Sequence, residues 1–146
     1  MHYLLAKLTI KQVMSSPVTA VTMDTPLEEA ARIMADQKIG GLPVLDQGEL
    51  VGIITETDLF KVLLEMMGAR EKGVRLNVRV PNRAGEIAKL SQAIFNLGGN
   101  IIALGTSAGE DPSTSTLTLK VVGPELEKLR TLIEPLVLRL TDIRTC

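Results

Sequence analysis

The stretch GIITETDLF (residues 52–60) decides the fold of the first half of the chain. A glycine and two isoleucines predict the end of a buried strand, and apolar residues resume at 59–60 as a helix begins. Between these runs lie Thr55, Thr57 and Asp58, which place two hydroxyls and a carboxylate around the first turn of that helix. A helix cap needs one such group, whereas a bound sugar-phosphate can use all three.

The bulk composition is that of a globular protein without an obvious macromolecular ligand. The 146 residues are 45% apolar and 23% charged, with a net charge of −1. This balance gives no electrostatic reason to expect nucleic acid or a membrane surface as a partner. The few aromatic side chains (Tyr3, Phe60 and Phe95) argue against a stacking platform for single strands.

Cysteine and histidine are too scarce for catalytic or metal chemistry. Cys146 is the only cysteine and His2 is the only histidine, so a disulfide, a cysteine metal cluster and a Ser-His-Asp triad are not expected. We therefore expect no catalytic residues, no metal, no cofactor and no enzymatic activity. Without an apolar run of about 20 residues or a signal peptide, a cytoplasmic location is expected.

The first half alternates short strands with two helices. A strand is predicted over 18–22, followed by a helix start at DTPLEE (24–29), with Thr25 as N-cap and Glu28 closing a capping box. The strands LPVL and LVGIIT flank DQGE (46–49), which is typical of a hairpin turn. A second apolar helix stripe then ends at Gly68.

The second half changes character after the polar connector AREKG (69–73). Valine and leucine alternate with Arg75, Asn77 and Arg79, which predicts a strand with one buried face. The following elements complete the order β-α-β-β-α-β, that of a ferredoxin-like sheet. We therefore predict an α+β protein with two domains, residues 1–72 and 73–146.

Both halves resemble known sensory modules. The first half resembles a CBS motif, named after cystathionine β-synthase, along MSSPVTAVTMDTPLEEAARIMADQKIGGLPVLDQGELVGIITETDLF. The second half is similar to an ACT domain, an amino-acid-sensing module, along VPNRAGEIAKLSQAIFNLGGNI. In this order the two modules look like the C-terminal part of the acetoin-utilisation regulatory proteins, which carry two CBS motifs and then ACT. The resemblance covers nearly the whole chain.

The resemblance implies a single CBS motif, half of a Bateman module, followed by a ferredoxin-like ACT domain. Residues 1–12 resemble the linker helix that follows a first CBS motif in tandem relatives. Two interpretations stay open: a fragment that lacks a first motif, or a short protein that takes its partner motif from another subunit. The second interpretation implies a homodimer or higher assembly, formed through CBS pairing and ACT sheets.

The resemblance also implies an adenine-nucleotide site in the first half. Its predicted residues are Thr19, Ala20, Val21, Gly41, Leu42, Pro43, Thr55, Thr57 and Asp58. Asp58 would accept both ribose hydroxyls, Thr57 would meet phosphate, and Leu42 with Pro43 would pack on adenine. Because Gly40 and Gly41 stand where relatives often have a basic residue, AMP or adenosine is favoured over ATP.

A structural interpretation of the same residues is also open. Thr55 or Thr57 would then cap the helix, and Asp58 would complement its dipole. On the nucleotide interpretation, an alanine at position 58 would abolish AMP binding and leave the melting temperature of the unliganded protein nearly unchanged.

For the second half, the resemblance implies an amino-acid site at the subunit edge, where loop 81–87 and the start of the second strand meet. Its predicted residues are Asn82, Gly85, Glu86, Ile87, Asn100 and Ile101. Gly85 would let backbone amides approach a carboxylate, and Asn100 would take the amino group. Glu86 opposes a ligand carboxylate unless its side chain turns outward. The alternative is a turn and a helix start without a ligand.

These features predict a non-enzymatic regulatory sensor that binds an adenine nucleotide at the first site and an amino acid at the second. Its expected partner is a protein target still to be identified. The alternative is a structural dimerisation module whose ligand clefts are vestigial.

Overall fold

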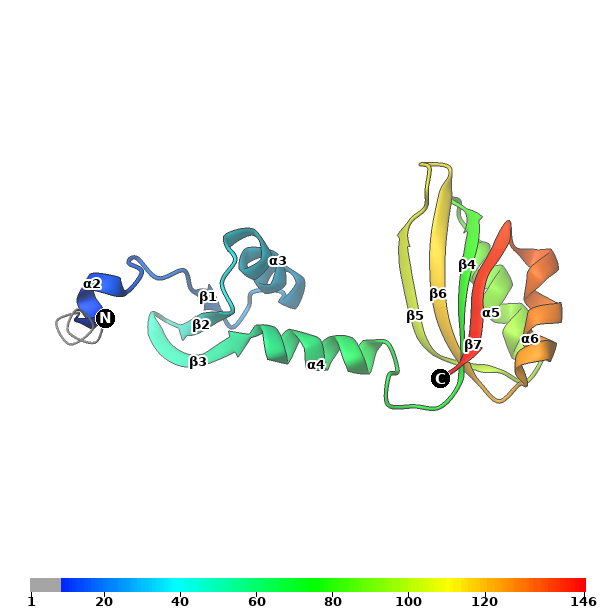
Figure 1. Cartoon of the computed structure of the whole chain (residues 1–146), viewed down its shortest axis with the longest axis horizontal. Coiled ribbons are helices and arrows are strands. Elements are labelled where there is room, and N and C mark those ends of the chain that lie inside the picture. Colours follow the sequence, from blue (N-terminus) through cyan, green and yellow to red (C-terminus); the bar gives the residue numbers. More distant parts are fainter. Residues whose placement is uncertain (1–8) are drawn as a thin grey trace, which may run out of the picture. The chain divides into compact units, whose positions relative to one another are not determined.

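A computed structural model describes residues 9–146, which form two compact units in a mixed α+β fold (Figure 1). The first unit ends at Phe60 and the second runs from Lys61 to Cys146, so they divide inside helix α4, Glu56–Met66. The boundary predicted after residue 72 stays a prediction. Of the predicted linker over 1–12, residues 1–8 lie outside the described part, and the short helix α2 (Ile10–Val13) follows.

The first unit contains a three-stranded sheet in the order β1-β2-β3, with helix α3 (Leu27–Gln37) between the first two strands along the chain. The strands are β1 (Val21–Thr22), β2 (Gly41–Asp46) and β3 (Glu49–Thr55). β1 runs parallel to β2, and β2 pairs antiparallel with β3. Gln47 and Gly48 connect that pair with φ angles of 47° and 88°, as a primed turn requires, so the predicted hairpin is confirmed.

The start of α3 differs from the sequence prediction. Pro26 occupies the N-cap position and its carbonyl accepts the first helical hydrogen bonds, without a side-chain cap. The hydroxyl of Thr25 instead accepts the backbone N–H of Thr22 at 3.0 Å. Thr25 as N-cap and the capping box with Glu28 were therefore wrong, because the turn after β1 already engages that hydroxyl.

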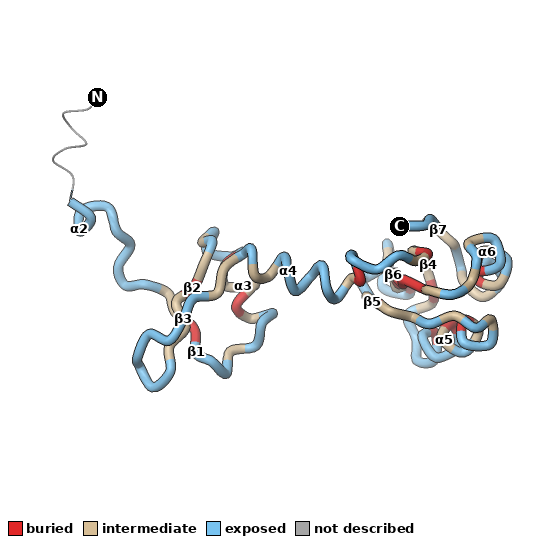
Figure 2. The backbone as a smooth tube through the Cα atoms, turned by 90° about the horizontal axis from the view of Figure 1, so that it is seen from below, coloured by how far each residue is buried: buried red, intermediate tan, exposed pale blue. Residues whose placement is uncertain are grey.

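The core of the first unit is small. Four apolar side chains are buried in it: Val21, Ala30, Met34 and Leu42. Most of the hairpin and of α4 is exposed (Figure 2), including Leu50 and Ile53 with exposed fractions of 69% and 66%. The unit therefore leaves much of its apolar surface uncovered, as small units with few buried residues do.

The second unit has the predicted element order β-α-β-β-α-β. The elements are β4 (Val74–Pro81), α5 (Glu86–Asn96), β5 (Asn100–Ala108), β6 (Thr114–Val122), α6 (Leu126–Ile133), the 3₁₀ turn η1 (Glu134–Leu136) and β7 (Arg139–Thr145). The sheet order is β5-β6-β4-β7, with every neighbouring pair antiparallel. Both helices lie on the same side of this sheet (Figure 1).

Alternation along β4 explains why this sheet has one covered face. Val74, Leu76, Val78 and Val80 are buried, and the residues between them are half-buried. The buried set packs with Leu90, Ile94, Leu129 and Ile133 from the two helices. The predicted period of two is confirmed, and it leaves a polar outer face on the sheet.

Candidate functional site

The junction of β3 and α4 carries the first candidate site. The carboxylate of Asp58 accepts the backbone N–H of Thr55 at 3.1 Å and its hydroxyl at 2.7 Å. In return, the Asp58 N–H donates to the Thr55 hydroxyl at 3.4 Å. This reciprocal pair is a capping box at the start of α4, so both side chains have a structural role.

The capping box corrects one expectation from the sequence. Removing the Asp58 carboxylate takes away an acceptor for Thr55, and loss of a cap costs about 1 kcal/mol. An alanine at position 58 would therefore lower the stability of the unliganded protein, in contrast to the sequence expectation. Thr57, one residue earlier on the same turn, is exposed.

Several predicted nucleotide residues lie at the same end of the first sheet. Gly41 pairs with Thr55 across β2 and β3, and Val21 pairs with Val44 in the parallel register of β1 and β2. Thr19 and Ala20 precede β1 and therefore run toward the same end of β2. The Thr19 hydroxyl donates to Gln37 Oε1 of α3 at 2.8 Å. The sheet register thus brings together the two segments that the sequence proposed.

Two predicted contact residues are buried in the core instead. The Leu42 side chain is fully buried and Val21 nearly so, and both pack with α3. The predicted packing of Leu42 on adenine was therefore wrong for this chain. Pro43 is half-buried and lines an apolar hollow of about 500 Å³ with residues 50–53. Since alternate strand residues face opposite ways, Leu42 and Pro43 cannot share one surface.

The charge around this junction is acidic. Glu56 and Asp58 lie on the first turn of α4. The Glu56 Oε2 atom lies 3.6 Å from the point that a Cβ on Gly40 would occupy. The neighbouring residues Gly40 and Gly41 carry no charge.

Loop 81–87 carries the second candidate site. It borders a cavity of about 270 Å³ in the second unit. The lining residues are Val80, Pro81, Asn82, Arg83, Ala84, Gly85, Glu86, Ile87, Thr106, Ser115 and Leu117. Four of the six residues predicted for an amino-acid site belong to this wall. The sequence missed Thr106 and Ser115, because only strand pairing places them there.

Gly85 occupies the N-cap position of α5 with a φ of 94°, without a side-chain cap. This left-handed conformation favours glycine, so the loop can turn into the helix without strain. The carbonyl of Gly85 accepts the Lys89 N–H at 2.9 Å. The backbone amides of the first turn of α5 therefore lie next to the cavity wall.

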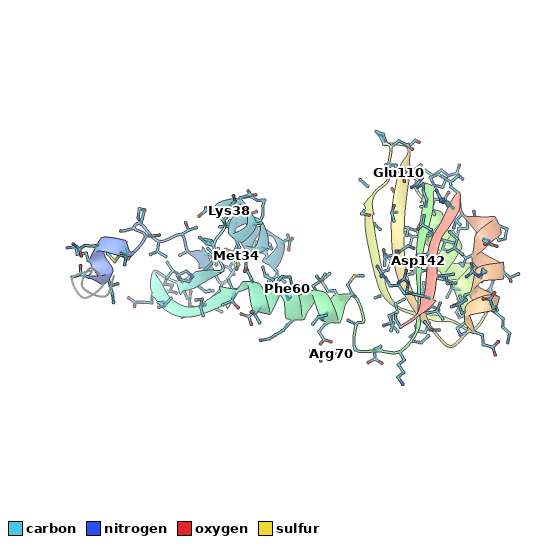
Figure 3. All side chains as sticks on the ribbon, in the orientation of Figure 1. Met34, Lys38, Phe60, Arg70, Glu110 and Asp142 are labelled. Atoms are coloured by element: carbon cyan, nitrogen blue, oxygen red, sulfur yellow. The ribbon has the colours of Figure 1, made fainter. Side chains whose placement is uncertain are left out.

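Asn82 is held by the loop between β5 and β6. Its side-chain N–H donates to the Pro112 carbonyl at 3.1 Å, and its backbone N–H donates to the Ser113 carbonyl at 2.7 Å. In that loop the hydroxyl and backbone N–H of Ser113 hold the pKa of Asp111 below its ordinary value. Glu110, at the tip of the same loop, pairs with Arg79 (Figure 3). Asn82 thus supports the wall of the cavity.

Glu86 turns inward. It is only 6% exposed, and its carboxylate accepts Arg83 Nε at 2.7 Å. The sequence indicated that Glu86 opposes a ligand carboxylate unless its side chain turns outward, and in the structure the side chain is buried. The i,i+3 spacing of Arg83 and Glu86 on one turn is the signal that could have predicted the pair. The Arg83 guanidinium is largely exposed and offsets the buried charge.

Asn100 and Ile101 lie at the opposite end of the sheet from loop 81–87. Asn100 pairs with Val122, whereas Ala108, at the other end of β5, pairs with Ser115. Pro81 at the end of β4 pairs with Thr114, beside that second end. Within one chain, the two parts of the predicted amino-acid site therefore do not meet, and the prediction that they form a site at a subunit interface stays a prediction.

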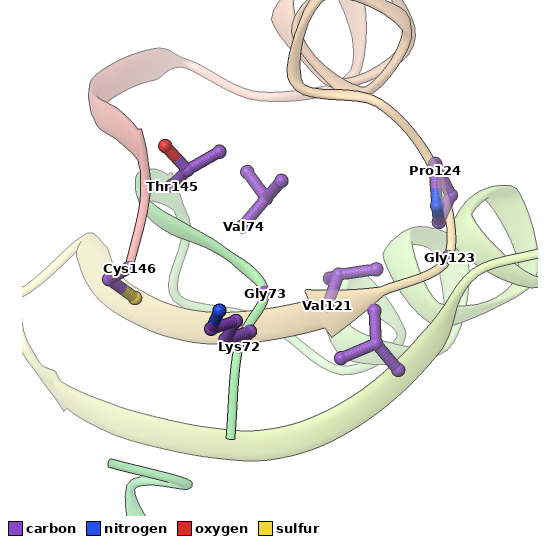
Figure 4. Close-up of a pocket in the computed structure, with 9 residues that line it drawn as sticks. Lys72, Gly73, Val74, Val121, Gly123, Pro124, Thr145 and Cys146 are labelled. Carbon is purple, nitrogen blue, oxygen red and sulfur yellow. The ribbon is translucent and has the colours of Figure 1, made fainter. Parts of the chain in front are cut away.

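A further cavity lies near the Asn100 end of the sheet, where β4 begins and β6 and β7 end (Figure 4). Its volume is about 510 Å³. The lining residues are Lys72, Gly73, Val74, Val121, Val122, Gly123, Pro124, Thr145 and Cys146. The sequence pattern gives no sign of it, because strand ends distant in sequence form its walls.

Within residues 9–146, no helix is long and apolar enough to cross a membrane. Over the same residues, no group of three histidine, cysteine, aspartate or glutamate side chains could hold a metal ion.

Comparison with known proteins identifies the first candidate site as part of a recognised module. Residues 10–65 match the family model of the CBS domain. This range contains β1, α3, the hairpin and nearly all of α4. The polar residues at the β3–α4 junction therefore lie within the segment that matches the CBS domain.

Similar proteins align with part of the chain. An uncharacterised protein of Methanocaldococcus jannaschii is 28% identical over 62% of this chain and 50% of its own. The magnesium transporter MgtE of Thermus thermophilus is 46% identical over 37% of this chain and 12% of its own. An inosine-5'-monophosphate dehydrogenase of Thermoplasma acidophilum is 45% identical over 29% of this chain and 9% of its own. The chain thus aligns with half or less of these relatives.

A solved structure aligns with part of the chain. It is the ACT domain of a GTP pyrophosphokinase of Chlorobium tepidum, and all of it aligns with 52% of this chain. The identity is 16% and the TM-score is 0.37, values too low to support a conclusion on ligand or activity.

Proposed function

We propose that the protein is a non-enzymatic regulatory sensor that binds an adenine nucleotide, AMP or adenosine, at the β3–α4 junction. The observation that carries the proposal is the CBS match over residues 10–65, a range that includes Thr57 and Asp58 on the first turn of α4. The link to acetoin utilisation and the downstream protein target stay predictions from the resemblance.

The chemistry of the junction supports a ribose-phosphate ligand. An ionised carboxylate has about four acceptor positions, and both Thr55 donors of the cap meet the Oδ2 atom of Asp58. A carboxylate at this position can therefore serve the cap and a ribose together. The Thr57 hydroxyl and the amides that open α4 suit a phosphate group. The acidic Glu56 nearby favours a monophosphate or a nucleoside.

The distribution of the module supports a regulatory role. Part of the chain is similar to a stretch of a magnesium transporter and to a stretch of a dehydrogenase, and these stretches make up 12% and 9% of those proteins. A segment shared by proteins of unrelated activity is best explained as an accessory module. The alternative remains a structural dimerisation module with vestigial clefts.

Asp58→Asn tests the nucleotide site. Asparagine keeps an oxygen acceptor for the cap but loses the charge that strengthens hydrogen bonds from ribose hydroxyls. We expect the Kd for AMP to rise at least about tenfold, equivalent to about 1.4 kcal/mol. The melting temperature of the unliganded variant should fall less than that of Asp58→Ala. Isothermal titration calorimetry and thermal melts give both quantities.

Asp24→Asn is the matched control, because Asp24 is an exposed carboxylate in the same unit. It should leave AMP affinity unchanged. Equal affinity of the Asp58→Asn variant and the wild type would limit Asp58 to the helix cap. A wild-type protein that binds neither AMP nor adenosine would favour the structural module instead.

A second ligand site is supported by the topology of the other unit. Its β-α-β-β-α-β order and sheet order are those expected of an ACT domain, and β5 is an edge strand. Two copies that pair their β5 strands antiparallel about a two-fold axis would bring the Asn100 end of one beside loop 81–87 of the other. We propose that this pairing completes an amino-acid site and forms a homodimer.

Leu104→Cys in a Cys146→Ser background tests the strand pairing. Residue 104 is the middle of β5, so a two-fold axis at the centre of the strand places it beside its own copy. Mild oxidation should give a disulfide-linked dimer on a non-reducing gel. Leu138→Cys in the same background is the control, because Leu138 is exposed but lies outside β5. A Leu104→Cys variant that stays monomeric under oxidation contradicts the pairing.

A further inference from the structure

Lys120 is the only buried cation among residues 9–146. It lies on β6 with an exposed fraction of 5%, between Leu119 and Val121 of the helix-covered face. Its own side chain therefore lies on the outer face of the sheet. A buried ammonium group is costly unless it is hydrogen-bonded. Lys120 Nζ donates to the Gly68 carbonyl at 2.8 Å.

Gly68 ends helix α4 in a Schellman motif. Its N–H donates to the Glu65 carbonyl and the Ala69 N–H donates to the Leu64 carbonyl, at 3.0 and 2.9 Å. Gly68 has the positive φ, 58°, that this motif requires. A lysine ammonium at this point also meets the negative end of the helix dipole. Lys120 thus binds a helix terminus that already has its own backbone cap.

The end of α4 packs closely on the sheet. A Cβ on Gly68 would lie 3.3 Å from Ile102 Cδ1, 3.5 Å from Lys120 Cδ and 3.6 Å from Ala103 Cβ. Residues of β5 and β6 therefore hold the backbone of Gly68 from one side. The cation and these close contacts together fix the last turn of the helix within the second unit.

The same helix takes part in the core of the first unit. Leu59 packs against the buried cluster of Met34 and Leu42, and Thr55 caps the first turn. With four buried apolar residues, the first unit gains little stability from its own core. Its stability therefore depends strongly on α4 remaining a well-ordered helix.

We propose that the Lys120–Gly68 hydrogen bond, called the latch below, holds the end of α4 on the outer face of the sheet. Through this helix, the stability of the first unit depends on the second unit. The coupling passes along the helix itself. Any event that displaces α4 must move or break the Lys120–Gly68 bond, and loss of that bond must loosen the first unit. This role goes beyond ligand binding at either candidate site and does not depend on it.

Amide hydrogen exchange in the full-length, unliganded chain tests the latch. Lys120→Met keeps most of the apolar stem but removes the donor to Gly68. We expect amides of β2 and β3 in the first unit to exchange at least about tenfold faster, because α4 is less firmly held. Amides of β4 and β7 should keep their rates. Lys128→Met, which removes an exposed lysine on α6, should change neither set.

Lys120→Arg is the control for the possibility that the Lys120→Met substitution damages the sheet itself. Arginine keeps a charged donor, so it should restore slow exchange in β2 and β3. Wild-type exchange rates in β2 and β3 of the Lys120→Met protein would overturn the proposal. Failure of Lys120→Arg to slow them again would also overturn it, because the effect would then not depend on the donor.

Discussion

Replacing Leu42 with alanine is expected to lower the free energy of unfolding of the first unit by about 2–5 kcal/mol. Leu42 is fully buried and is one of four buried apolar residues among residues 9–60. The truncation leaves a cavity in the core of the first unit. Few other core side chains are available to shift into it, so it stays largely unfilled. Urea denaturation followed by residue-resolved nuclear magnetic resonance would separate this loss from the second unit.

Leu50→Ala is the matched control for Leu42→Ala. Leu50 lies on the same hairpin but is largely exposed, so its truncation should change stability little. The pair also distinguishes the core role of Leu42 from the adenine contact that the resemblance implies. Unchanged stability with weaker AMP binding in Leu42→Ala would show that the side chain serves the ligand instead of the core.

Gly99→Ala is expected to destabilise the second unit by about 1–3 kcal/mol, the usual cost of overpacking a core. A Cβ at this position would lie 2.7 Å from Ile94 Cγ2 and 3.1 Å from the Ile94 carbonyl oxygen. Ile94 is fully buried, and its carbonyl accepts the Gly99 N–H, so neither atom can move away freely. Thermal unfolding of the second unit measures the effect.

Gly105→Ala, within β5, provides the comparison, because Gly99 directly precedes that strand. Its added Cβ would have no neighbouring atom within 4 Å, and its φ is not in the left-handed region. Alanine should therefore be neutral there, or slightly stabilising through the unfolded chain. Equal losses at positions 99 and 105 would contradict the steric explanation and indicate a general cost of replacing glycine in this sheet.

Local patterns in the sequence predict much of this fold. The alternation of Val74 to Val80 predicts a half-buried strand, and Gly48 is the residue type that the second central position of a primed turn favours. Gly68 was correctly predicted to end a helix. Each of these features depends on residues close together in the chain, where periodicity and backbone preference dominate.

Features that depend on pairing between distant segments were not predictable in the same way. The sequence cannot show that Asn100 pairs with Val122, at the end of the sheet remote from loop 81–87. The burial of Lys120 follows from a contact with Gly68, 52 residues earlier. Competition for one hydrogen-bonding group was also not visible in the sequence. The Thr25 hydroxyl could cap the following helix or accept a backbone N–H in the turn, and in the structure it accepts the Thr22 N–H.

The capping box at the β3–α4 junction poses a similar limit. Thr55 and Asp58 have the residue types of both a cap and a ribose site, and the sequence left the two interpretations open. The structure shows the cap directly in the hydrogen bonds between them. A carboxylate can serve both roles.

The register of β5 has a consequence for how the protein would respond in a cell. Because Asn100 and loop 81–87 lie at opposite ends of one sheet, a site that needs both must be shared between two chains. Binding and association are then thermodynamically linked, and each strengthens the other by mass action. The apparent affinity for the ligand would then depend on the concentration of the protein as well. Cells that make more of it would sense the same metabolite at a lower concentration.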